Sequence, residues 1–352
     1  MLMIIKIMNN FDVIIIGLLS TLISIIIMRP IAIMLKLIDY PDDRKQHKGE
    51  IPLIGGICIF CGVIVCLVYL AEENFTINII LIFTLFVLIL GVYDDLKNLK
   101  PKIKLFIQLF LVIMSVYLSE IKIESLGFLL GLPFPQILGL LSIPFTIISI
   151  MGLMNAFNMI DGLDGQAGLT SFLALIGIFI FGLDEADNYL YKILLIILSG
   201  LIVFLIFNVS SNKKMKIFLG DGGSLFLGFL ISFSLIYCTQ ILNIFSPSFA
   251  LWCVTIPLFD FFSVVILRKT KKQNLIQANR DHIHHFLETF NFPKTFIPFL
   301  TFAFGLVFLS LGYYLEINFP SLSFCIFILL FLFYLTIRLY YEQKVKNKKE
   351  LF

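Results

Sequence analysis

The segment INIILIFTLFVLILGVYDD, residues 77–95, is one of the clearest indications of how this chain folds. It carries no charge until its last two residues, the adjacent carboxylates Asp94 and Asp95. A run of this length is close to the roughly 20 apolar residues that a helix needs to cross the hydrocarbon core of a bilayer. Comparable uncharged runs occupy residues 51–70, 295–315 and 317–337. We therefore predict a transmembrane helix here and a chain that crosses the membrane many times.

The overall composition favours the same class. Hydrophobic residues make up 59% of the 352-residue chain, and charged residues only 14%. Inside a bilayer every backbone polar group needs an internal partner, so spanning segments are helices or closed barrels. The apolar runs are continuous rather than alternating, which argues against a barrel. The sequence predicts an all-α polytopic membrane protein, with a single integral domain over residues 1–352.

Windows of membrane length give about eleven transmembrane helices. We expect them to begin near residues 11, 51, 77, 104, 135, 165, 191, 217, 248, 296 and 318. The uncharged stretch at residues 222–259 is too long for one helix, so we divide it near residues 243–247. The first apolar segment lacks a convincing cleavage site and is interpreted as a retained helix.

The basic residues orient these helices. If the loop after the first helix is cytoplasmic, every lysine and arginine except Lys6, Lys122 and Lys192 falls on the cytoplasmic side, as the positive-inside rule requires. The N-terminus is then outside and the C-terminus is in the cytoplasm. The basic tail at residues 339–352 is expected to contact membrane lipids or solvent rather than nucleic acid.

Polar residues gather in five loops on the cytoplasmic side of this topology. The loops lie near residues 35–50, 94–104, 156–166, 208–224 and 268–295, and they contain all four histidines. Ionisable groups at a membrane surface are costly to keep, so their gathering indicates a functional site. We expect the five loops to converge at one site.

Two of these loops are rich in carboxylates. Asp94 and Asp95 point about 100° apart on a helix, so one can face a ligand while the other supports it; a solvated acid pair is the alternative. Lys104 shares a helix face with Gln108 and could offer a cation to the same place. Polar residues also recur at three-residue steps at the end of a span, where helix caps and turns are the alternative: Asn155, Asn158, Asp161 and Asp164.

A glycine-rich segment opens a later helix. In Gly220-Asp221-Gly-Gly-Ser224, free backbone N–H groups, a carboxylate and a hydroxyl would seat a phosphate with its Mg²⁺. An aspartate that only caps the helix is the alternative. Further along, Asp260 lies at membrane depth and requires a partner, for which Arg268 is within reach.

The last loop offers a guanidinium and imidazoles at Arg280, His282, His284 and His285. These groups suit a diphosphate, and zinc is the competing ligand. The hard carboxylates of the other loops favour Mg²⁺ over zinc. Together the loops indicate transfer of a phosphate-linked group to or from a lipid. A transporter or carrier of anionic head groups and a Mg²⁺-dependent phosphatase remain the alternatives.

Five segments, at residues 42–56, 91–95, 155–165, 217–224 and 282–285, resemble in order and spacing the polyprenyl-phosphate N-acetylhexosamine-1-phosphate transferases. The resemblance covers about residues 29–290. It is closest to the branch that transfers N-acetylglucosamine 1-phosphate to undecaprenyl phosphate. The peptidoglycan branch, which transfers phospho-N-acetylmuramoyl-pentapeptide, carries three consecutive histidines where this chain has His-Ile-His-His.

The resemblance implies a reaction at the cytoplasmic face of the bacterial inner membrane. Undecaprenyl phosphate attacks the β-phosphate of a UDP-N-acetylhexosamine, giving a lipid-diphosphate-sugar and UMP with the help of Mg²⁺ or Mn²⁺. This would be the first membrane step of a cell-envelope polysaccharide such as O-antigen. N-acetylglucosamine is the favoured sugar. The downstream glycan and the oligomeric state stay open, with a homodimer as one alternative.

The resemblance also implies roles for individual residues. The catalytic group would be Asp94, as a base or a positioning group, with Asp95, Asp161, Asp164, His284 and His285. Asp221 would be the main metal ligand, joined by Asp94 and Asp161. Substrate would be bound by Lys45, His47, Lys104, Asn155, Asn158, Asn208, Arg280 and His282.

Overall fold

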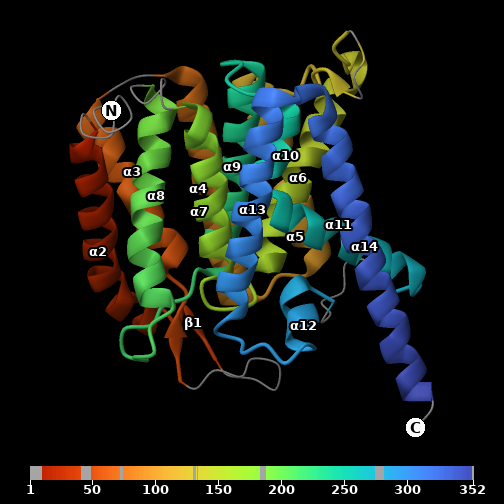
Figure 1. Ribbon diagram of the computed structural model, residues 1–352. Coiled ribbons are helices and arrows are strands. Elements are labelled where there is room, and N and C mark those ends of the chain that lie inside the picture. The colour runs from red at the N-terminus through yellow and green to blue at the C-terminus, as the bar shows by residue number, and fades with distance from the viewer. Residues whose placement is uncertain are drawn as a thin grey trace.

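The computed structural model describes residues 10–40, 49–71, 74–129, 132, 134–182, 188–273 and 281–350. Within these ranges the chain is mostly helical, with one two-stranded sheet formed by β1 (Ile38–Asp39) and β2 (Ile51–Pro52). Figure 1 shows the helices standing side by side as a bundle, with the sheet and the short helix α12 at its lower end. The helices are α2 (Phe11–Met34), α3 (Gly55–Leu70), α4 (Phe75–Lys97), α5 (Pro101–Ser119), α6 (Ser142–Ile160), α7 (Gln166–Gly182), α8 (Tyr189–Asn208), α9 (Gly220–Gln240), α10 (Pro247–Cys253), α11 (Thr255–Thr270), α12 (Ile283–Glu288), α13 (Ile297–Asn318) and α14 (Pro320–Glu350).

The structure is mostly helical with long apolar helices, as predicted, although it also contains the small sheet of β1 and β2, and the count of eleven spans is only partly supported. In the described part of the chain eight helices are long and apolar enough to cross a membrane, or nine if α10 and α11 form one broken span. The apolar helices α3 and α7 are shorter, with 16 and 17 residues. Each of the expected starts still falls within a few residues of a helix or, near residue 135, just before one. The orientation of the termini remains a prediction.

The span expected from residue 248 is not a straight helix. It consists of α10 and α11, which meet at an angle of 85°. Pro257 explains the break, because it has no N–H to bond the carbonyl of Cys253 and its ring would clash with that carbonyl if α10 continued. In the first turn of α11 the missing N–H costs nothing. Figure 1 shows the result, with α11 running sideways across the bundle toward α14.

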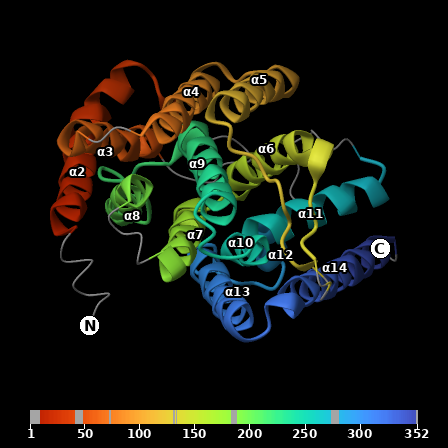
Figure 2. The same cartoon turned by 90° about the horizontal axis from the view of Figure 1, so that it is seen from above.

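Helix α9 lies at the centre of the bundle, as the view from above shows (Figure 2). Its membrane-length window is 100% buried, and it packs against α4, α6 and α3. Two glycines let the backbones approach at its first turn. A Cβ at Gly91 of α4 would lie 2.4 Å from the Cα of Gly222, and one at Gly56 of α3 would lie 2.3 Å from the Cα of Gly223. Small residues at helix crossings are the usual device for close packing in membranes.

The outer helices present large apolar side chains to their surroundings. Examples are Ile26 of α2, Phe106 and Tyr117 of α5, and Phe333 of α14, each more than 60% exposed. Apolar surface on this scale is unusual for a protein in water and is expected for one in contact with lipid. The exposed faces and the long apolar helices together support a membrane protein.

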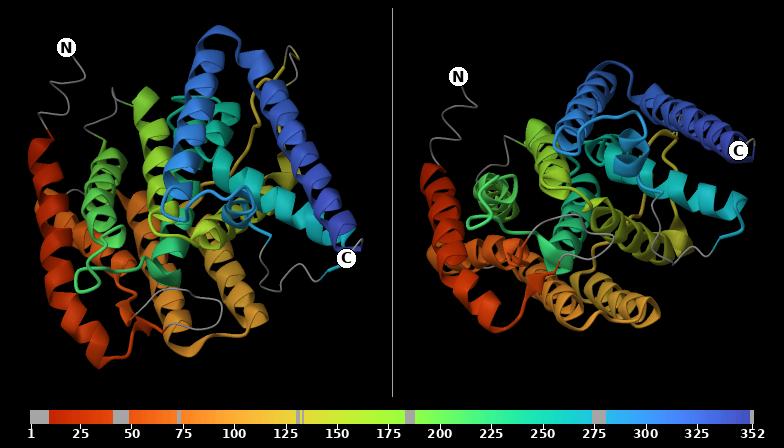
Figure 3. Two further views of the ribbon diagram at one scale, coloured as in Figure 1. Left: turned by 60° about the horizontal axis from the view of Figure 1, so that its bottom comes forward. Right: turned by 90° about the horizontal axis from the view of Figure 1, so that it is seen from below.

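The small sheet fixes the segment that leads into α9. Ile38 pairs with Pro52 in antiparallel register, and the N–H of Phe218 donates to the carbonyl of Pro52 at 2.9 Å. The N–H of Gly55 in turn donates to the carbonyl of Phe218. Segments far apart in the sequence are thereby joined at the end of the bundle that carries the polar loops. Figure 3 shows this end from below.

Candidate active site

Lys104 lies at the centre of a group of polar side chains, which also contains Asp94, Asn158 and Asp221 and is called the Lys104 cluster. Its Nζ lies 2.8 Å from Oδ2 of Asp94 and 2.5 Å from Oδ2 of Asp221, and it donates to Oδ1 of Asn158 at 3.3 Å. These residues come from α5, α4, α9 and α6. The structure thus brings together side chains that the sequence placed in three different loops. One lysine contacts both carboxylates and offsets the repulsion between them.

The adjacent acids have different tasks. Asp94 faces Lys104, and its Oδ1 accepts from the N–H of Leu99 at 2.7 Å. Asp95 accepts from the N–H of Asp221 at 3.1 Å and from that of Gly222 at 3.3 Å. Asp95 therefore caps α9 from a neighbouring helix and holds the backbone of Asp221 in place.

This cap corrects one expectation from the sequence. The first N–H groups of α9 were expected to be free to hold a phosphate, but the structure pairs those of Asp221 and Gly222 with a carboxylate. Gly220 has φ +76°, and a Cβ there would lie 2.7 Å from Oδ2 of Asp95. Glycine is needed at this position for the turn and for the approach of the cap, rather than for a phosphate.

Asp161 lies just after α6 in a negative environment. Burial raises its pKa well above the ordinary value, and the charges of Asp221, Asp95 and Asp164 raise it further. Asp164 is ion-paired with Lys216, whereas no lysine or arginine among the described residues is paired with Asp161. A carboxylate whose pKa is raised by its neighbours marks a position where an added cation would be stabilised.

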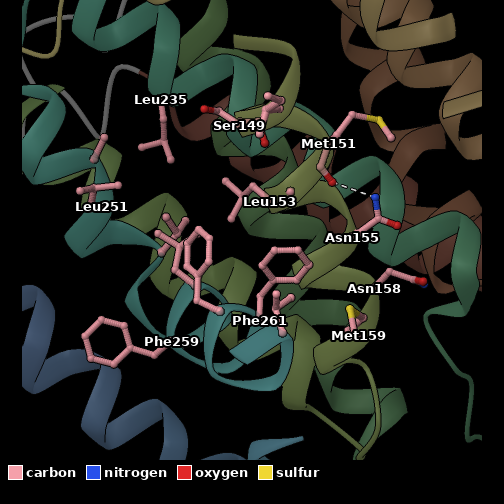
Figure 4. Close-up of a pocket in the computed structure, with 18 of the residues that line it drawn as sticks. Ser149, Met151, Leu153, Asn155, Asn158, Met159, Leu235, Leu251, Phe259 and Phe261 are labelled. Atoms are coloured by element: carbon pink, nitrogen blue, oxygen red, sulfur yellow. Dashed lines mark hydrogen bonds between the residues drawn. The ribbon is translucent and has the colours of Figure 1, made fainter. Parts of the chain in front are cut away.

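The asparagines expected to bind substrate differ in their surroundings. Nδ2 of Asn158 donates to Oδ1 of Asp221 at 3.0 Å and to Oγ of Ser224 at 2.9 Å. Nδ2 of Asn155 donates to Oε1 of Gln108 and to the carbonyl of Met151, the second bond being drawn in Figure 4. Both asparagines line a large cavity that extends from the cluster.

Asn208 instead joins two loops. Its Oδ1 accepts from the N–H of Gly165 at 2.5 Å, and its Nδ2 donates to the carbonyl of Ile217 at 2.9 Å. The side chain is buried, with 4% of its surface exposed. In this arrangement Asn208 clamps the loop after α6 to the segment before α9. Its expected contact with substrate remains a prediction.

The histidines belong to the short helix α12: His282 directly precedes it, and His284 and His285 lie in it. Nδ1 of His282 is 2.8 Å from Oδ2 of Asp260, and Nδ1 of His285 is 3.2 Å from Oε2 of Glu288. The ring of His284 packs on Gly162, where a Cβ would lie 2.4 Å from the ring. Burial, and then the charge of His285, lower the pKa of His284 to about 3. Its ring is therefore neutral at pH 7.

Asp260 has a different partner from the one expected. It pairs with Nη1 of Arg338 at 3.2 Å as well as with His282, while Nε of Arg268 lies 3.8 Å from Asp281. Arg338 was not among the site residues expected from the sequence. Its signal was present, because it is a charged residue directly after the uncharged run at residues 317–337 and so lies at the end of a predicted span, where a buried charge requires a partner.

The cavity that extends from the cluster has a volume of about 1720 Å³. At one end it is lined by Asp94, Lys104, Asn158 and the histidines, and along most of its length by apolar residues of α5, α6, α9, α10, α11 and α14. Figure 4 shows Leu153, Met159, Phe259 and Phe261 among the lining side chains. It continues to Leu126, which follows α5 at the end opposite Lys104. The cavity is therefore long and apolar with one polar end.

Three of the expected site residues lie outside the described residues: Lys45, His47 and Arg280. Among the residues that are described, no three His, Cys, Asp or Glu side chains come together in a geometry that would hold a metal ion. Zinc sites are built from three or four such ligands, whereas Mg²⁺ is commonly held by one or two carboxylates together with phosphates and water. The donor set present here fits the second kind of site.

The fold and the site define a multi-span membrane protein that can hold an anionic group beside a long apolar molecule. Similarity to known proteins identifies the family within this class. The model of glycosyl transferase family 4 matches residues 77–239. A probable undecaprenyl-phosphate N-acetylglucosaminyl 1-phosphate transferase of Bacillus subtilis is 32% identical over 301 residues, which cover 84% of this chain and 81% of that protein.

Two other relatives are undecaprenyl-phosphate alpha-N-acetylglucosaminyl 1-phosphate transferases. That of Haemophilus influenzae is 32% identical over 76% of each chain, and that of Salmonella typhi is 28% identical over 76% of this chain and 73% of the relative. The chain belongs to glycosyl transferase family 4. The resemblance inferred from the motifs is confirmed.

Proposed function

We propose that this protein transfers N-acetylglucosamine 1-phosphate from UDP-N-acetylglucosamine to undecaprenyl phosphate, releasing UMP. The reaction takes place at the cytoplasmic face of the bacterial inner membrane. The observation that carries the proposal is the Lys104 cluster at the polar end of a long apolar cavity. The names of the relatives, which are transferases of this kind, support the same activity.

The cavity suits the lipid acceptor. A polyprenyl chain requires an apolar groove that remains open to the membrane, and its phosphate requires cations at the end of that groove. Lys104, 13% exposed at the polar end, supplies a cation. Lys104 already contacts Asp94 and Asp221. It can exchange one of these contacts for one to the phosphate and so hold the phosphate beside the acids.

The acceptor phosphate needs little activation. A phosphate monoester has its second pKa near about 6 and is largely a dianion at pH 7. Asp94 therefore acts mainly by orienting Lys104 and the acceptor, and a full proton abstraction is not required. A bond forms between an oxygen of the lipid phosphate and the β-phosphorus of the donor, while the bond from that phosphorus to the oxygen of UMP breaks. The bonds made and broken are alike, so the reaction is reversible.

The donor lies against the remaining groups of the cluster. Asn158 holds Oδ1 of Asp221 and Oγ of Ser224, which fixes the orientation of the Asp221 carboxylate. His282 and His285 line the same cavity, and in the protonated form each ring can donate from Nε2 to the oxygens of the diphosphate. The neutral ring of His284 packs on Gly162 and shapes the wall beside them.

Mg²⁺, or Mn²⁺ in its place, fits the acids of the cluster. One or two of the acids Asp221, Asp94 and Asp161 would hold it together with phosphate oxygens and water, since carboxylate oxygens are the hard ligands that Mg²⁺ prefers. Burial, and then the charges of Asp221, Asp95 and Asp164, raise the pKa of Asp161, and a cation bound beside this carboxylate would offset both effects. When bound, the ion would neutralise charge on the phosphoryl oxygens.

The test is a donor panel with the purified protein in detergent. Undecaprenyl phosphate and Mg²⁺ are incubated with UDP-N-acetylglucosamine, UDP-N-acetylgalactosamine or UDP-N-acetylmuramoyl-pentapeptide, and UMP and lipid-linked sugar are measured together. The proposal expects both products in equal amounts from UDP-N-acetylglucosamine. Product from the pentapeptide donor would assign the protein to the peptidoglycan branch. UMP without lipid product would indicate hydrolysis, and a folded protein without UMP would indicate a carrier.

A further inference from the structure

A second polar cluster lies beside the site and is almost entirely enclosed. It consists of Asp260 on α11, His282 at the start of α12, and Arg338, Tyr334 and Ser263 around them. Asp260 and Arg338 are each 1% exposed. Nη1 of Arg338 donates to Oδ1 of Asp260 at 3.2 Å, to Oγ of Ser263 at 2.6 Å and to the hydroxyl of Tyr334 at 3.1 Å. A charge pair buried this deeply is costly unless its geometry is fixed and satisfied.

Asp260 holds α12 by two contacts. Its Oδ1 accepts from the backbone N–H of Ile283 at 2.6 Å, which caps the helix at its first residue. Its Oδ2 lies 2.8 Å from Nδ1 of His282. With Nδ1 engaged by the carboxylate, Nε2 is the ring nitrogen left for a ligand in the cavity that His282 lines. An imidazole oriented in this way by a carboxylate has a fixed rotamer and a fixed proton position.

Arg338 brings a distant helix into this arrangement. It comes from α14, which follows the last of the polar loops, and lies outside the residues matched by the family model. Its guanidinium is 5.8 Å from the ring centre of Phe286 on α12. Phe259, next to Asp260, packs on Tyr334 and Phe331 of α14. Helix α14 therefore contacts both the residue that holds α12 and α12 itself, and Figure 3 shows these elements close together from below.

We infer that Asp260 and Arg338 are positioning residues for the sugar-nucleotide subsite: Asp260 orients His282 and seats α12, and Arg338 supplies the charge that balances Asp260 and holds it in place. The inference rests on the proposed function. It makes helix α14 a part of the structure that positions the donor subsite. Loss of the pair should therefore affect the kinetics of the donor and not those of the lipid acceptor.

The experiment uses the full-length protein and three variants. These are Asp260→Asn, Arg338→Met and the double variant, with Ser323→Ala as the matched control. Ser323 also joins α14 to the bundle by a buried hydrogen bond, from Nε1 of Trp252 at 2.9 Å, but it lies well before Arg338 on that helix. Steady-state kinetics for donor and acceptor are combined with thermal unfolding and with amide hydrogen exchange of residues 281–289.

The inference expects kcat/KM for the UDP-sugar to fall about 10- to 100-fold in each variant, with the KM for undecaprenyl phosphate unchanged. Hydrogen exchange at residues 281–289 should become faster, and Ser323→Ala should change neither quantity. Arg338→Met leaves a buried charge without its partner, so its unfolding temperature should fall. The double variant removes both charges and should recover that temperature while its activity stays low.

Recovery of activity together with stability in the double variant would show that the pair only stabilises the fold and would overturn the inference. Unchanged exchange at residues 281–289 in both single variants would overturn it as well. If the wild-type protein releases no UMP from any donor, the proposed function fails, and the exchange measurement still decides whether Asp260 and Arg338 seat α12.

Discussion

The Lys104 cluster and the Asp260 cluster differ in exposure and in charge balance. In the Lys104 cluster the side chains of Asp94, Lys104 and Asp221 are 10%, 13% and 37% exposed, and several acids surround one lysine. In the Asp260 cluster the acid and its arginine are each 2% exposed by side chain and their charges balance. An unbalanced, accessible cluster is suited to receiving a ligand, whereas a balanced, enclosed one is suited to holding structure.

The largest effect should come from removing the carboxylate at the centre of the accessible cluster. Asp221→Asn keeps the shape of the side chain but removes the charge that would hold the metal and face the reacting phosphates. We expect kcat to fall on the order of 1,000-fold or more, with little change in unfolding temperature. UMP release and thermal unfolding measure the two quantities.

The matched control is Asp12→Asn at the start of α2, where the carboxylate accepts a surface hydrogen bond from Tyr69. It should keep wild-type activity. Near-normal turnover by Asp221→Asn would remove this residue from the catalytic group.

Replacing the lysine should have the next largest effect. Lys104→Met leaves Asp94 and Asp221 close together without a cation, so kcat/KM should fall about 100-fold. The variant should also be less stable than the wild type, because two neighbouring carboxylates then repel each other. Added Mg²⁺ should raise its unfolding temperature more than that of the wild type. An equal Mg²⁺ shift in both proteins would contradict a metal site at these acids.

The close approach of the helices gives a prediction about stability. Gly91→Ala would place a methyl group 2.4 Å from the backbone of Gly222, and backbone atoms cannot move aside as a side chain can. We expect a loss of about 1–3 kcal/mol and a loss of activity, since α9 carries Asp221. Gly152→Ala is the comparison, because a Cβ there has nothing within 4 Å. It should be no less stable than the wild type, and denaturant unfolding in detergent would rank the two.

The smallest effect concerns pH. The pKa of His284 is about 3 in the folded protein, lowered by burial and by His285, against an ordinary value of 6.5. Between these values the unfolded chain binds a proton that the folded protein does not, so stability decreases as the pH falls from 6.5 toward 3. His284→Gln should be less sensitive to pH in this window. If the unfolding temperature changed by the same amount between pH 7 and pH 5 in the wild type and in His284→Gln, the result would contradict a neutral, buried His284.

The positions of most helices could be predicted because hydropathy indicates them, although the predicted count of eleven spans is only partly supported. Uncharged runs of membrane length are typical of transmembrane helices, and the helices begin close to the expected residues. The break at Val254 required knowledge of how Pro257 sits in its helix. The convergence of the polar loops followed from the topology, since the positive-inside rule placed them on one side.

The connections within the site could not be predicted in the same way. The cap that Asp95 forms on α9 joins residues 126 positions apart, and the pair between Asp260 and Arg338 spans 78 positions. Neither is encoded in local spacing, because both depend on how the helices pack. Arg338 could have been suspected as a charge at the end of a predicted span, but its partner could not have been named.

The most direct test of the proposed transfer follows the phosphorus atom. UDP-N-acetylglucosamine labelled with ³²P at the β-phosphate is incubated with undecaprenyl phosphate and either the wild-type protein or Asp221→Asn. We predict that the label moves into the lipid fraction in step with UMP release in the wild type only. Label that appears in water as N-acetylglucosamine 1-phosphate, or that moves equally well with Asp221→Asn, would contradict the proposed reaction and its site.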